Sequence, residues 1–65
     1  MKIQCNDIDV QIVATCLHEA LQELGYGGAT VATALNGEFV PQSLRAQAEI
    51  REGDRIDVLA PMQGG

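Results

Sequence analysis

The clearest chemical feature of the sequence is its last segment, "PMQGG", which ends in Gly64 and Gly65. Because glycine has no Cβ, two glycines form the thinnest possible backbone and can enter a narrow channel. An α-carboxyl group has a reference pKa of about 3.5, so the carboxylate of Gly65 is ionised and nucleophilic at neutral pH. If a partner enzyme held this oxygen in line with the α-phosphate of ATP, an acyl-adenylate could form. Its activated carbonyl would then accept a sulfur, an amine or a thiol.

Other chemistries lack the necessary residues or spacing. The two cysteines, Cys5 and Cys16, form no CxxC motif, and a metal site or iron–sulfur cluster needs more converging ligands than they supply. Cys16 and His18 stand two positions apart on a predicted helix, where side chains point in different directions. The glycine-rich "GYGG" has no lysine and follows a helix instead of leading into one, unlike a P-loop. We therefore expect no bound cofactor or metal and no enzyme activity in the chain itself, with ATP used by a partner.

Length and charge favour a binding module over an enzyme. A chain of 65 residues makes one domain with little core in which to enclose a ligand. Nine acidic residues against four basic ones disfavour nucleic acid and anionic membranes as partners, and suit docking on a basic protein surface. No signal peptide or apolar run of membrane-spanning length is present, so we expect a cytoplasmic chain that is monomeric when free.

The first half of the chain predicts a hairpin and one helix. "MKIQC" alternates in polarity like a half-buried strand, "NDID" has turn composition, and "VQIV" has the composition of a second strand. Apolar residues then recur at helical spacing in "TCLHEALQEL". Thr15 is the predicted N-cap of this helix, and Gly25 the predicted left-handed stop.

The second half predicts three further extended segments. A strand over 31–36 and a short strand over 38–40 are joined at Asn36-Gly37, a dipeptide typical of tight hairpin turns. Pro41 ends the short strand because proline cannot donate to a ladder. Residues 42–50 read as one helical turn and an extended piece, and 55–60 as the last strand.

These elements predict an α+β fold, a mixed sheet of four or five strands with one packed helix. If the first and last strands lie parallel at the centre, the topology is the ubiquitin-like β-grasp. Residues 1–60 form the predicted domain, and residues 61–65 a flexible tail that projects because Pro61 stops the strand. On the open face of the sheet we expect Leu59, Ala32 and Ala34, a small apolar patch suited to docking.

Several motifs together resemble one known family, the ThiS-type sulfur carriers of thiamine thiazole biosynthesis. They are "MKIQCND", "HEALQELG", "ALNGEFVPQSL" and "REGDRIDVLAPMQGG", and the resemblance covers the whole chain. It implies the β-grasp fold and adenylation of Gly65 by a ThiF-type adenylyltransferase. A cysteine-desulfurase pathway would then supply sulfur for a thiocarboxylate, which a ThiG-type thiazole synthase would receive. Gly64, Gln63 and Met62 would thread the partner's channel.

Three alternatives remain open from the sequence. The carriers of the molybdopterin pathway also end in two glycines, although they are usually longer. A protein modifier would use the same adenylate but finish in an isopeptide bond to a lysine. A passive interaction domain would not need its tail at all.

Overall fold

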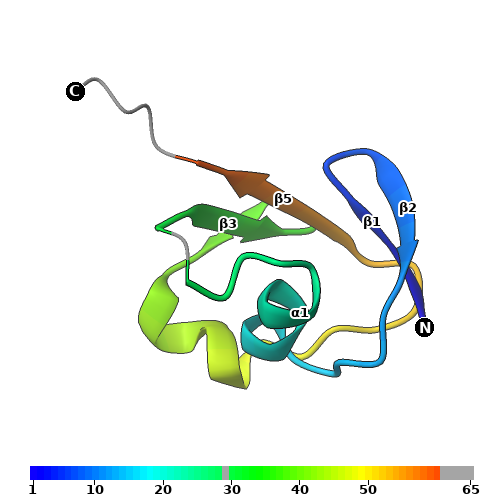
Figure 1. The fold of residues 1–65 in the computed structure, drawn as a ribbon, viewed down its shortest axis with the longest axis horizontal. Helices are drawn as coiled ribbons and strands as arrows, with labels where there is room; N and C mark the ends of the chain where they lie inside the picture. Colours follow the sequence, from blue (N-terminus) through cyan, green and yellow to red (C-terminus); the bar gives the residue numbers. More distant parts are fainter. Residues whose placement is uncertain (29, 61–65) are drawn as a thin grey trace.

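The fold is a five-stranded mixed sheet with one α-helix, as seen in a computed structural model that describes residues 1–28 and 30–60 (Figure 1). The strand order is β2-β1-β5-β3-β4, with β1 and β5 parallel at the centre and the other pairs antiparallel. The predicted tail, which contains Met62, Gln63, Gly64 and Gly65, lies outside the described residues. The elements are β1 (Lys2–Cys5), β2 (Ile8–Gln11), α1 (Leu17–Glu23), β3 (Ala32–Leu35), β4 (Glu38–Val40), the 3-10 helix η1 (Gln42–Gln47) and β5 (Arg55–Leu59). The expected β-grasp is confirmed.

The first hairpin turns more tightly than its composition predicted. Asn6 and Asp7 both have positive φ, 51° and 68°, and they alone connect the strands. Two residues of this kind make a tight turn whose twist matches that of the flanking strands. The second strand therefore begins at Ile8, not Val10, and the predicted four-residue turn was wrong.

The helix is shorter than predicted and starts later. Thr15 does not cap it; Cys16 is the N-cap residue, without a side-chain capping bond. Thr15 and Cys16 instead pair with an extended segment later in the chain: the carbonyl of Thr15 accepts from Ile50 N–H at 3.0 Å, and Cys16 forms an isolated β-bridge with Glu49. The left-handed stop is confirmed at Gly25, with φ of 97°. Within the described residues no helix has the length and apolar character needed to cross a membrane.

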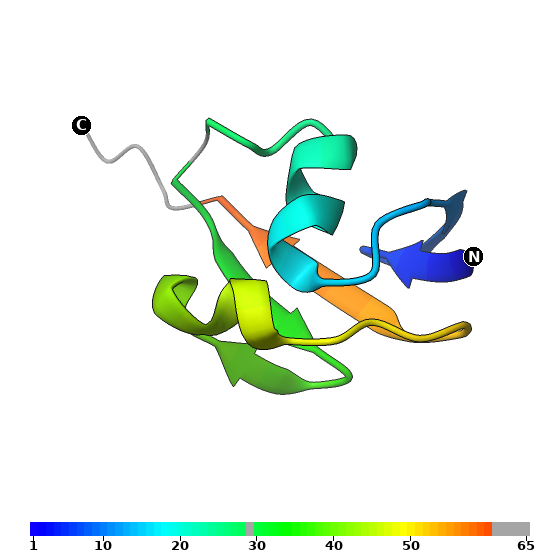
Figure 2. The ribbon, with the colours of Figure 1, turned by 90° about the horizontal axis from the view of Figure 1, so that it is seen from below.

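The core lies between α1 and one face of the sheet (Figure 2). The helix buries residues spaced i, i+3 and i+4, which form one stripe along its surface. Each fully buried aliphatic side chain stabilises the fold by about 1.5–3 kcal/mol. The buried apolar residues are Ile3, Cys5, Ile12, Ala14, Leu17, Ala20, Leu21, Ile50, Ile56 and Val58.

A buried arginine joins η1 to the second half of the sheet. Arg45 is only 8% exposed, and its Nε donates to Thr33 Oγ1 at 3.1 Å while Nη2 donates to the carbonyl of Val31 at 2.6 Å. The Thr33 hydroxyl in turn donates to the carbonyl of Val40 at 3.1 Å. A buried charged group is tolerated only when it is hydrogen-bonded, so these oxygens hold Arg45 in place and fix η1 against β3.

We expect Thr33→Val to lower the free energy of unfolding by about 1–3 kcal/mol, because Arg45 Nε loses its acceptor with little change in side-chain volume. Urea unfolding measures this difference. Thr30→Val is the matched control: Thr30 is exposed, so its replacement should change stability by less than about 0.5 kcal/mol. Equal losses in the two variants would show that the buried hydrogen-bond chain contributes nothing.

Candidate partner interface beside the end of β5

The sheet face opposite α1 carries a row of small and apolar side chains at the end of β5. Ala32 lies opposite Leu59, and Ala34 lies opposite both Asp57 and Phe39. Paired residues share a face of a sheet, and these positions alternate with the buried Thr33 and Val58. We call Ala32, Ala34, Phe39 and Leu59 the distal patch.

The structure places the three predicted patch residues on this face together. Leu59 is 70% exposed, Ala32 is exposed, and Ala34 is partly buried. On the other side of β3, Val31 and Leu35 pack against the core, as the alternation predicted. A contact role for the patch remains a prediction, but its residues are accessible and adjacent.

Phe39 is a patch residue that sequence reasoning missed. It is 69% exposed, which makes it one of the large apolar side chains left open to solvent. A three-residue strand is too short for its alternation to reveal which side faces the core. The two-residue turn at Asn36-Gly37 held the missing signal, because it sets Glu38 opposite Leu35 and therefore Phe39 opposite Ala34.

An open hollow of about 280 Å³ adjoins the distal patch where β5 ends. Its lining is almost wholly apolar and comprises Thr30, Val31, Ala32, Leu59 and Ala60. Ala60 directly precedes Pro61 in the sequence, so the hollow lies beside the residue from which the predicted tail continues. The hollow therefore extends the apolar part of this face up to the point where the predicted tail begins.

The rest of the open face is polar. Arg55 and Asp57 form an ion pair of 3.4 Å next to the patch, and Lys2 pairs with Asp9 at 3.7 Å nearer the chain start. Both pairs are substantially exposed and contribute little to stability. The apolar part of the open face is therefore limited to the end of β5 and to β3 and β4.

The side chains with reactive groups lie away from the distal patch. Cys5 is buried in the core, and its burial, with a smaller contribution from the Asp57 carboxylate, raises the pKa of the thiol. Cys16 is partly buried at the start of α1. Among residues 1–28 and 30–60, no three histidine, cysteine or acidic side chains cluster as metal ligands would. The reacting group predicted from the sequence, the carboxylate of Gly65, lies outside these residues and stays a prediction.

Comparison with known proteins relates this arrangement to one family. A family model described as the ThiS family matches residues 4–65, nearly the entire chain including its terminal diglycine. The chain belongs to the ThiS family.

Relatives of this ThiS-family chain agree with the assignment. It is 35% identical to the sulfur carrier protein ThiS of Escherichia coli over 66 aligned positions that cover both chains completely. It is 36% identical to a thiazole synthase of Paramagnetospirillum magneticum, of which it spans only 20%. The crystal structure of the thiamine biosynthesis protein ThiS from Geobacter metallireducens superposes with a TM-score of 0.84 at 25% identity, with full coverage of both chains.

Proposed function

We propose that this chain is a sulfur carrier of thiamine biosynthesis that works through the carboxylate of Gly65. The observation that carries the proposal is the family match, which runs through Gly64 and Gly65 to the chain's last residue. The relative from Escherichia coli, similar over its full length, is a sulfur carrier by name. The chain itself is a protein substrate, and the reactions at its carboxylate are catalysed by its partners.

The first step is adenylation by a ThiF-type adenylyltransferase. A carboxylate oxygen of Gly65 attacks the α-phosphate of ATP, the bond to the β-phosphate breaks, and pyrophosphate leaves. The outer sulfur of a persulfide formed by a cysteine desulfurase then attacks the activated carbonyl and displaces AMP, which gives an acyl disulfide. A second thiol attacks the donor's sulfur in this disulfide, forms a new disulfide with the donor and releases the thiocarboxylate on Gly65. A thiazole synthase receives this sulfur. The relative named thiazole synthase supports that acceptor, since one fifth of it matches this whole chain.

Docking combines the distal patch with the tail. The exposed Leu59 and Phe39 and the apolar hollow offer a contact area next to the last described residue. A stable interface usually buries about 800 Å² on each partner, so threading of Met62, Gln63 and Gly64 into a channel must add to the patch. The net charge of −5 favours a basic partner surface and speeds the encounter. The two free thiols, Cys5 and Cys16, suit a reducing cytoplasm.

The test is intact-mass spectrometry after incubation with ATP, a ThiF-type adenylyltransferase, a cysteine-desulfurase sulfur source and a thiol reductant. We expect a mass increase equal to the replacement of one oxygen by sulfur, located at Gly65, and its loss when thiazole synthase and its substrates are added. A larger conjugate on lysine would indicate a protein modifier. A thiocarboxylate consumed only by a molybdopterin-forming enzyme would indicate the related pathway, and no change at Gly65 would contradict the carrier proposal.

A further inference from the structure

The central strand β5 extends beyond one of its two neighbours. Its parallel pairing with β1 ends at Cys5 opposite Ile56. One more main-chain bond follows, from Asn6 N–H to the carbonyl of Ile56 at 3.0 Å, and the chain then turns away into β2. Strand β5 continues to Leu59, held on its other side by Ala32 of β3.

The turn at Asn6 leaves the main-chain groups of Val58 facing a gap in the ladder. Hydrogen bonds in an antiparallel pair alternate along the strand, and Asn36 N–H donates to the carbonyl of Arg55 on the β3 side at 2.7 Å. Ile56 correspondingly directs its carbonyl towards β1. Val58, two residues further along, points its N–H and C=O in this same direction, where β1 has already ended.

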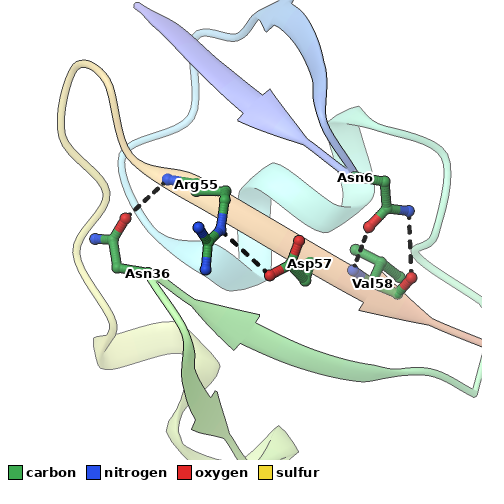
Figure 3. A network of polar contacts seen from close by, with 5 residues as sticks. All are labelled: Asn6, Asn36, Arg55, Asp57 and Val58. Atoms are coloured by element: carbon green, nitrogen blue, oxygen red, sulfur yellow. Dashed lines mark hydrogen bonds and ion pairs between the residues drawn. The ribbon is translucent and has the colours of Figure 1, made fainter.

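The side chain of Asn6 fills this gap (Figure 3). Val58 N–H donates to Asn6 Oδ1 at 2.8 Å, and Asn6 Nδ2 donates to the carbonyl of Val58 at 3.2 Å, both in partly buried surroundings. A carboxamide carries the same donor and acceptor as a peptide group, so it takes the place of one strand residue. The left-handed conformation of Asn6, which asparagine tolerates better than most residues, brings the side chain into position.

We propose that Asn6 is a positioning residue for the reaction at the C-terminus, a role that rests on the proposed carrier function. Its two hydrogen bonds to Val58, on the edge of β5 where β1 has ended, keep the end of β5 ordered up to Leu59, the patch residue nearest the tail. The direction in which the chain leaves the sheet is then set before the partner binds. Without the carboxamide, these last strand residues must be ordered on docking, which weakens productive binding.

The structure supplies a matched pair of variants for this test. Asn36 also has a positive φ, 52°, also lies in a hairpin turn and also bonds to β5, but at the opposite end of the strand (Figure 3). Its Oδ1 accepts from Arg55 N–H at 2.9 Å, and its Nδ2 donates to Asp54 Oδ1 at 3.1 Å. Asn6→Gly and Asn36→Gly each remove two side-chain hydrogen bonds, and glycine preserves the left-handed backbone in both.

Two measurements separate positioning from general stability. The first measurement is kcat/KM for adenylation by a ThiF-type enzyme, with the enzyme's substrate concentration corrected for the folded fraction of each variant. We expect Asn6→Gly to lower kcat/KM about three- to tenfold, mainly through a higher KM, and Asn36→Gly to change it less than about twofold. Hydrogen exchange followed by NMR should accelerate at the amides of Val58 and Leu59 in Asn6→Gly alone. Urea unfolding confirms that both variants are folded under the assay conditions.

The outcomes are distinct. Equal kcat/KM losses in the two variants, or unchanged exchange at Val58 in Asn6→Gly, would overturn the positioning role while the carrier function stands. If the wild-type chain itself is not adenylated, the carrier function fails, and the role of Asn6 in that reaction fails with it.

Discussion

Deletion of Gly65 should reduce the rate of adenylation by at least about 100-fold. A misplacement of a reacting atom by about 1 Å already lowers a rate by about this factor. Removal of one residue moves the terminal carboxylate by roughly 3.3–3.6 Å. The new terminal carboxylate, on Gly64, has the same chemistry but stops short of the α-phosphate. The assay is ATP-dependent attachment of AMP, followed by intact-mass spectrometry with a ThiF-type enzyme. Extension of the chain by one glycine should have a similar effect, since the carboxylate then lies beyond the phosphate.

The control for this deletion keeps the tail's length and changes its composition. Gln63→Ala leaves the terminal carboxylate in register, so adenylation should persist at a rate well above that of the deletion variant. Among residues 1–28 and 30–60, the buried apolar residues lie between Ile3 and Val58. Because terminal residues usually make few contacts, the thermal midpoint of the deletion variant should match that of the wild type. Normal adenylation of the shortened chain would show that Gly65 is not the reacting residue.

Leu59→Lys should lower kcat/KM for adenylation about 30-fold, the effect of losing a hot-spot residue at an interface. Leu59 is 70% exposed beside the apolar hollow, so a lysine there removes apolar contact and brings a positive charge towards a surface that we expect to be basic. Pull-down with the adenylyltransferase and steady-state kinetics both measure the loss. The stability of the free chain should change by less than about 0.5 kcal/mol, because the side chain is outside the core.

Val13→Lys is the matched control. Val13 is 87% exposed in the loop between β2 and α1, away from the distal patch, and its N–H is bonded to the Glu23 carboxylate, which would tolerate a nearby lysine. We expect its adenylation kinetics to equal those of the wild type. Similar losses in the two lysine variants would mean that added charge alone, rather than the distal patch, determines docking.

Local patterns predicted most of the elements of the fold. Alternation located β1 and β5, and the left-handed preferences of Gly25 and of Asn36-Gly37 predicted a helix end and a hairpin turn. These signals are local, because they depend on neighbouring residues along one element. The predicted four-residue turn and the predicted helix start at Thr15 were wrong. Asp7 adopts a positive φ, which ends the turn early, and Thr15 bonds to Ile50, a partner far along the chain.

The missed features depend on contacts between distant residues. Arg45 and Thr33 were assigned no role from the sequence, and they are both buried and joined by a hydrogen bond. Phe39 was assigned to neither face of the sheet, and strand register puts it on the open face. Asn6 was read only as turn composition, although its side chain meets Val58, 52 residues away. Alternation predicted that Leu59, Ala32 and Ala34 share the open face of the sheet, whereas Phe39 could be added to the patch only from the strand register. Docking at this patch remains a prediction.

The central position of β5 has a consequence for how this chain is made. Strands β1 and β3 are not neighbours in the sheet, and β5 lies between them, so the sheet cannot close until Leu59 has left the ribosome. Bonds such as those between Asn6 and Val58 join the two ends of the domain, and contacts so distant in sequence slow folding. A nascent chain interrupted before β5 consequently has neither a complete sheet nor a distal patch. If the chain is the proposed carrier, products that end before β5 therefore cannot compete, as folded domains, for the enzyme that activates Gly65.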